Sequence, residues 1–117
     1  MATNVKYDRG SNVRLELTVG ASQTKGSVIL ISQMPVFLLE ASDSANKAPC
    51  ILPGSFVAEL AVTGANAGGN SAVAVGDRLY KDGTEINKDA TNGVSIGYAL
   101  ATVGSGATAT IQVLMFA

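Results

Sequence analysis

Few residues in this chain could do chemistry, and three aspartates in one short stretch are the first candidates. Asp77, Asp82 and Asp89 could suggest a calcium-binding loop, but they stand five and seven residues apart. Such a loop places its oxygen ligands at alternate residues and closes with a glutamate at its twelfth position. Asp77 also follows Gly76, where a side-chain oxygen can bond to nearby backbone N–H groups. The spacing therefore predicts turn-forming acids, with no metal and no cofactor.

Nucleophilic and acid–base catalysis are poorly supported by the residue inventory. The chain has no histidine, so neither a Ser-His-Asp nor a Cys-His site can be built. A pair of carboxylates could still hydrolyse a glycoside, but only 5% of the residues are aromatic and few rings could hold a sugar. Cys50, the single cysteine, lies between two prolines in an apolar stretch, which favours a small buried side chain over a reactive thiol. We predict that the protein is not an enzyme.

The segment 20–27, GASQTKGS, has the composition of a phosphate-binding loop but not its order. A P-loop requires Gly-Lys-Ser/Thr ahead of a helix, so that backbone N–H groups surround the phosphates. Here Lys25 precedes Gly26, and no helical pattern follows. The sequence predicts a hairpin loop at this position and gives no support to a nucleotide-driven activity.

Composition restricts the partners of this 117-residue, single-domain chain. Eight basic and nine acidic residues give a net charge of −1 without a basic cluster, so nucleic acid is not expected. The longest apolar runs, 28–31 and 36–39, are far too short to span a membrane. The N-terminus lacks the apolar region of a secretory signal, so we expect synthesis in the cytoplasm.

Apolar residues recur with the period of β-strands. Segments 13–17 and 56–62 alternate between apolar and polar side chains, whereas no segment keeps a 3.6-residue period. Pro35 is expected to separate two strands, and the segments 41–47 and 64–71 read as loops. Strands are predicted at residues 13–17, 28–32, 36–40, 56–62, 94–100 and 108–116, within a total of seven to nine.

We therefore predict an all-β fold, a compact single-domain β-barrel or sandwich of short strands with an extended N-terminal arm. The arm is residues 1–12, and the β-rich domain is residues 13–117. Tyr80 and Tyr98 are expected to be partly buried strand residues. Tyr7, in a polar segment, is the better candidate for a contact with a partner.

The last third of the chain is punctuated by turn signals. Asp82 with Gly83, and Asn92 with Gly93, are dipeptides that accept the positive φ of tight turns. A Gly-Ser-Gly turn at 104–106 precedes the final alternating strand. The order of these signals is VGD, then LY, then DG at 75–83, IGYAL at 96–100, and the strand at 108–116.

This order of motifs over residues 73–115 resembles the tailed-phage capsid cement (head decoration) proteins. The resemblance implies a small β-rich protein without enzymatic activity on the outer surface of the virion capsid. There it would form a homotrimer and clamp neighbouring subunits of the major capsid protein. Some members of that family carry a recombinase label, which the absence of a phosphate loop does not support here.

The N-terminal arm suits such a role, because an extended segment can add a strand or fill a groove on its partner. The predicted capsid contacts are Thr3, Asn4, Val5, Lys6 and Tyr7. A receptor- or glycan-binding β-module of a phage tail or fibre remains the alternative. A small β-barrel enzyme is a third and weaker interpretation.

Overall fold

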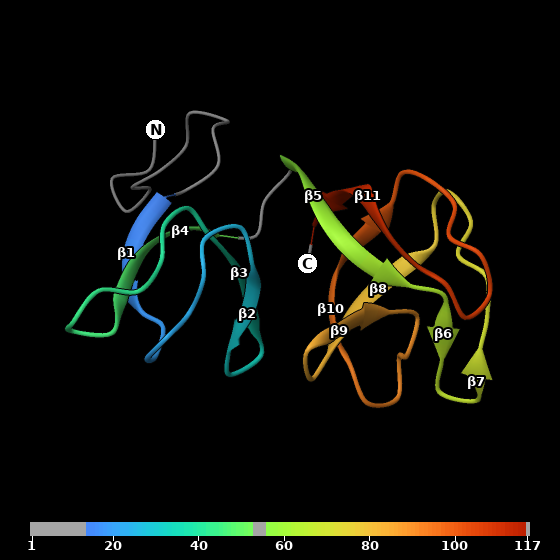
Figure 1. Cartoon of the computed structure of the whole chain (residues 1–117), viewed down its shortest axis with the longest axis horizontal. Helices are drawn as coiled ribbons and strands as arrows, with labels where there is room; N and C mark the ends of the chain where they lie inside the picture. Colours follow the sequence, from blue (N-terminus) through green and yellow to red (C-terminus); the bar gives the residue numbers. More distant parts are fainter. Residues whose placement is uncertain (1–13, 53–55, 117) are drawn as a thin grey trace, which may run out of the picture.

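The computed structural model describes residues 14–52 and 56–116, and every regular element in these ranges is a β-strand (Figure 1). All pairings are antiparallel and form an all-β, sandwich-like body, which confirms the predicted fold class. Among these residues, no helix meets the length and hydrophobicity of a membrane span. The strands are β1 Arg14–Thr18, β2 Val28–Ile31, β3 Met34–Leu38, β4 Lys47–Ile51, β5 Phe56–Thr63, β6 Ala65–Asn66, β7 Gly69–Asn70, β8 Arg78–Asp82, β9 Glu85–Asn87, β10 Val94–Ala99 and β11 Thr108–Met115.

The strands form two main sheets, which lie side by side along the longest axis of a flat body measuring 46 × 38 × 22 Å (Figure 1). The first sheet has the order β1-β4-β3-β2 and the second the order β5-β11-β10-β8-β9. In the second sheet β9 returns against β5, where the Lys88 N–H donates to the Ala65 carbonyl at 2.8 Å. The five-stranded sheet is therefore strongly curved and encloses its own core.

Two prolines lie inside strands of the first sheet, and at the first of them, Pro35, the sequence suggested a break. β3 starts before Pro35, which pairs with Leu30 of β2, so the prediction that a strand begins after this proline was wrong. The turn between β2 and β3 has two residues, so in an antiparallel ladder the Leu30–Pro35 pair exchanges no hydrogen bond and the missing N–H costs little. Pro49 lies in β4 where the β3–β4 ladder ends, and its carbonyl accepts the Leu39 N–H at 3.0 Å.

Two buried cores correspond to the two sheets. The core of the first sheet contains Val19, Val36, Leu38, Ala48 and Cys50. The larger core belongs to the five-stranded sheet and also takes in Val28 of β2. Phe37 of β3 meets Phe56 of β5 edge to face, with ring centroids 6.0 Å apart. The two sheets therefore contact each other through the β2–β3 hairpin. The larger core consists of Val28, Ala58, Leu60, Val62, Val73, Leu79, Ile86, Ile96, Ala99, Val103, Ile111, Val113 and Met115.

Several segments differ from the sequence-based expectation. The predicted hairpin at 20–27 was wrong, because β1 and β2 lie at opposite edges of their sheet and this loop connects the two edges. The predicted loop 64–71 contains the small β6–β7 hairpin, and strand β4 was not expected. The described residues form eleven strands, so the predicted total of seven to nine was wrong. The predicted arm, residues 1–12, and Val13 lie outside the described residues.

Candidate functional site

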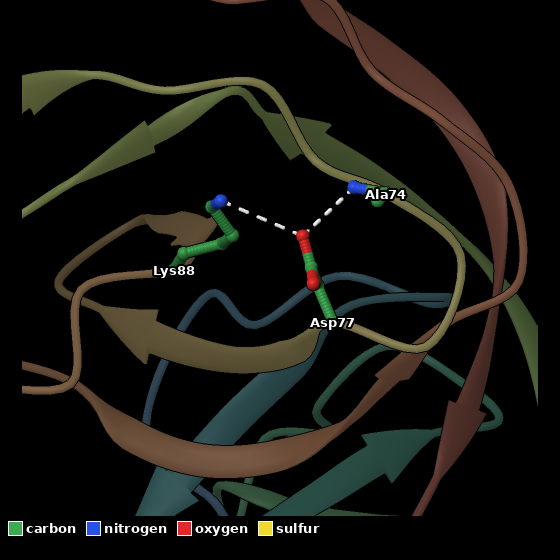
Figure 2. Close-up of polar contacts among 3 residues, drawn as sticks. All are labelled: Ala74, Asp77 and Lys88. Atoms are coloured by element: carbon green, nitrogen blue, oxygen red, sulfur yellow. Dashed lines mark hydrogen bonds and ion pairs between the residues drawn. The ribbon is translucent and has the colours of Figure 1, made fainter.

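Asp77 closes a turn, as its position after Gly76 predicted. Its Oδ2 accepts the Ala74 N–H at 2.8 Å and lies 3.5 Å from the Lys88 Nζ, so one carboxylate joins the turn to the end of β9 (Figure 2). Gly76 has a φ of +91°, a backbone conformation that other residues rarely adopt. Asp77 thus acts as the turn-forming acid that its position predicted.

Asp82 and Asp89 are brought together by the turn between β9 and β10. Asp89 is buried, and its Oδ1 accepts the N–H groups of Thr91 and Asn92, both at 3.0 Å, while its Oδ2 accepts the Asn92 Nδ2 at 2.9 Å. These bonds, those from Asn92 first, lower the pKa of Asp89. Loss of hydration, followed by the neighbouring Asp89 charge, raises the pKa of Asp82. Asp89 therefore stabilises the turn, and the pKa values of the two neighbouring carboxyl groups are shifted in opposite directions.

The described part of the chain contains neither a cluster of metal-binding side chains nor an exposed thiol. Within 14–52 and 56–116, no three His, Cys, Asp or Glu side chains are grouped so that they could hold a metal ion. Cys50 is fully buried, and its Sγ–H donates to the Ala48 carbonyl at 3.4 Å. Burial raises the pKa of this thiol, which keeps it protonated. The prediction that Cys50 is a small buried side chain is confirmed.

The feature that stands out is an apolar row across the outer face of the five-stranded sheet. Val57 of β5 is paired with Leu114 of β11, Leu114 with Tyr98 of β10, and Tyr98 with Arg78 of β8. Their chain neighbours Ala58, Val113, Ala99 and Leu79 are all buried on the inner face. Because side chains alternate along a strand, the four paired residues form one continuous stripe on the outer face.

Aromatic contacts hold this stripe in place. The rings of Tyr98 and Phe116 are stacked, with centroids 6.5 Å apart and planes inclined by 26°. The Phe116 N–H donates to the Ile96 carbonyl at 2.9 Å, which continues the ladder beyond β11. The Arg78 guanidinium lies 4.5 Å from the centre of the Tyr98 ring and donates through Nε to the Ser95 hydroxyl. We name the set Val57, Arg78, Tyr98, Leu114 and Phe116 the outer row.

The outer row is accessible, and its surroundings become polar along the sheet. Val57 is 53% exposed and Phe116 is 50% exposed, values that are high for large apolar side chains in a folded domain. Farther along the same face the paired residues are Gln112 with Glu59, and then Thr108 with Thr63, whose hydroxyls hydrogen-bond at 2.8 Å. An exposed apolar and aromatic centre beside a polar margin is the usual composition of a protein–protein contact surface.

Of the contact candidates chosen from the sequence, some lie within the described residues and others do not. Tyr80 and Tyr98 are partly buried strand residues, as predicted, and Tyr98 also belongs to the outer row. The predicted contacts Thr3, Asn4, Val5, Lys6 and Tyr7 lie outside the described residues. Sequence reasoning missed Val57 and Leu114, although the alternation within 56–62 already placed Val57 opposite the core face.

Comparison with known proteins adds no relative: no protein-family model, no curated protein and no solved structure matches this chain.

Proposed function

We propose that this chain is a structural virion protein that binds the outer surface of an icosahedral phage capsid. It acts there as a homotrimer that cements neighbouring subunits of the major capsid protein, and it catalyses no reaction. The resemblance of residues 73–115 to capsid cement proteins supplies the partner and the trimer. The outer row is the observation that carries the proposal for this chain.

The outer row suits adhesion because it combines accessible apolar area with aromatic and arginine anchors. Val57 and Phe116 offer apolar surface that folding leaves in water, and its burial in a complex is favourable. Arg78 is already oriented by Tyr98 and Ser95, so less side-chain entropy is lost on binding. A trimer would present three such rows at once, and weak individual contacts would then add up to durable binding.

Rebinding to stripped capsids tests the proposal. Purified protein is added to phage heads from which it has been removed, and both its binding and the rupture of the heads by heat or osmotic shock are measured. We expect saturable rebinding and a higher rupture threshold. With a net charge of −1, binding should persist in moderate salt, because long-range charge attraction contributes little.

A matched pair of variants locates the contact. Val57→Ser changes the outer row, whereas Val75→Ser changes a residue that is 63% exposed in the turn before Asp77. Combined with Phe116→Ser, the Val57 change should weaken binding to heads by about tenfold or more, while Val75→Ser leaves it unchanged. Equal affinity of all these variants would exclude the outer row as the contact surface.

The tail or fibre alternative makes the opposite prediction. The stacked rings of Tyr98 and Phe116 also offer an apolar platform on which a sugar could lie. Saturable binding of a glycan by the purified protein, together with no rebinding to heads, would replace the cement function by receptor binding.

A further inference from the structure

An open groove lies where the two sheets meet, away from the outer row. Its volume is about 360 Å³, at the lower end of the range of ligand-binding pockets. One wall comes from β2 and the loop before it, and the other from the β8–β9 turn. The groove is lined by Val19, Gln23, Val28, Ile29, Leu30, Lys81, Gly83 and Thr84.

Among the described residues that line the groove, Lys81 has the one ionisable side chain. It is half-buried, and no carboxylate of the described residues lies within ion-pair distance of its Nζ. Lys88, by contrast, lies 3.5 Å from the Asp77 carboxylate. Loss of hydration lowers the pKa of Lys81. The ammonium group of Lys81 is therefore less well solvated in the folded protein than in water. A carboxylate brought into the groove would restore a partner to that charge.

The opposite wall is apolar and belongs to the edge of a sheet. Among the described residues β2 pairs only with β3. In the alternating antiparallel pattern the N–H and C=O of Leu30 point away from β3, consistent with its partner Pro35, which has no N–H. Ile29 and Leu30, which are only partly buried, therefore offer apolar side chains beside unpaired backbone groups, which is the arrangement that an extended peptide uses to join a sheet edge.

We propose that this groove binds an extended, apolar peptide segment of a partner protein that presents a carboxylate to Lys81. The aliphatic side chains of the segment pack against β2, and its acidic group forms a charge-assisted hydrogen bond with the Lys81 ammonium. The occupant contacts both sheets, so its binding also restricts their relative movement. This inference stands independently of the proposed capsid function, because it concerns the free protein.

Titration with hexanoate, followed by the shifts of backbone amide NMR signals, tests the site. Hexanoate carries the carboxylate and the aliphatic chain, and hexanamide is its neutral match. We expect saturable shifts at Ile29, Leu30, Gly83 and Thr84 with hexanoate, and affinity lower by about tenfold with hexanamide. The absence of saturable shifts, or equal affinity for the two compounds, would overturn the proposal.

Lysine variants connect the binding to Lys81. Lys81→Met should lower the hexanoate affinity by about tenfold, whereas Lys81→Arg should keep it within about threefold. Lys25→Met makes the same charge change at an exposed residue of the 20–27 loop and should have no effect. Lys81→Met removes a poorly hydrated charge, so its thermal transition by circular dichroism should not fall. Undiminished hexanoate binding by the folded Lys81→Met variant would refute the role of Lys81.

A last arm distinguishes a peptide from a small carboxylate. An acetylated and amidated pentapeptide, Leu-Val-Glu-Val-Leu, should bind more tightly than hexanoate, because it can also bond to the free edge of β2. If hexanoate binds and the pentapeptide does not, the groove is a site for small carboxylates and the peptide proposal fails.

Discussion

The two sheets of this protein are built from similar residues but bury them to different extents. The four-stranded sheet has five buried residues in its core cluster, whereas the cluster of the five-stranded sheet has thirteen, one of them contributed by β2. Leu17, Ile29, Ile31 and Met34 remain only partly buried around the smaller core. The comparison indicates that the five-stranded sheet is the scaffold, and that the four-stranded sheet depends on contacts made through the β2–β3 hairpin.

The backbone of the five-stranded sheet also leaves less tolerance for change. Gly97 follows a register shift in the β8–β10 ladder, and a Cβ at this position would overlap the Leu114 carbonyl. Gly64 is similarly enclosed by the Gly104 carbonyl. In the loop that joins β1 to β2, Gly26 differs from these two glycines. A Cβ at Gly26 would meet no neighbouring atom, and only its positive φ disfavours other residues.

The largest expected effect is therefore that of Gly97→Ala. Because backbone surrounds the site, β10 and β11 must separate, and we expect the free energy of unfolding to fall by about 3 kcal/mol or more. Gly83→Asn is the matched control, since its φ of +62° suits asparagine and no atom lies near the added Cβ. Urea unfolding measures both. A Gly97→Ala variant as stable as the control would show that β10 can move away from β11.

Next in size are two leucines that are equally buried, Leu79 in the larger core and Leu38 in the smaller one. Leu79→Ala should cost about 3 kcal/mol and Leu38→Ala about 2 kcal/mol, because a thinner core relaxes more easily around a cavity. Amide hydrogen exchange should then show β1–β4 losing protection in Leu38→Ala while β10 and β11 keep theirs. Equal loss of protection in both sheets would mean that they unfold as one unit.

The two sheets also differ in how far their sequences predicted them. In the five-stranded sheet Gly83 and Gly106 adopt positive φ, and the alternation of β5 and β11 fixes which face is buried. The turn at Asn92 and Gly93 forms without a positive φ at either residue, so that prediction was wrong. In the four-stranded sheet Gly20 and Gly26 adopt positive φ in the loop between β1 and β2, but Ser32 and Asn46 adopt it without a glycine, so these two turns carry no comparable signal. The prolines fit inside β3 and β4 only because of a pairing pattern that local sequence does not specify.

Sequence predicted the parts of the candidate site unequally. The face of each outer-row residue follows from period-two alternation, but their alignment in one row depends on the register among β5, β11, β10 and β8. The stacking of Phe116 on Tyr98 depends on the chain continuing past β11 in that register. The groove at Lys81 joins residues that are more than 50 positions apart, and no motif relates them.

A double-mutant cycle on Phe37 and Phe56 measures the connection between the sheets directly. The edge-to-face pair should show a coupling free energy of about 1 kcal/mol, beyond the cost of the two separate Phe→Leu changes. Chemical denaturation of the two single variants and the double variant gives this value. A coupling near zero would show that the edge-to-face pair does not stabilise the contact between the sheets.

The smallest expected effect is that of changing Asp82 or Asp89. These changes test whether polar turns contribute to the greater stability expected of the five-stranded sheet. The pKa of Asp82 is raised above its ordinary value of 3.8, so its ionisation costs stability as the pH rises through the folded-state pKa. Asp82→Asn should therefore raise the melting temperature slightly, by about 1–2 °C near pH 7, and make no difference near pH 3.

The pKa of Asp89 is shifted in the opposite direction from that of Asp82. Its pKa is lowered below 3.8, so its stabilising effect is complete above that pH and is lost as the pH falls through the folded-state pKa. Asp89→Asn should lower the melting temperature near pH 7, because the new amide group faces the Asn92 Nδ2, and its deficit should shrink in acid. The control is Asp43→Asn in the loop between β3 and β4, where the Asp43 carboxylate also accepts two backbone N–H bonds, from Ala45 and Lys47. If Asp82→Asn and Asp89→Asn shift the melting temperature in the same direction at neutral pH, the pKa values of the two carboxyl groups are not shifted in opposite directions. The turn between β9 and β10 then owes its stability to packing rather than to charge.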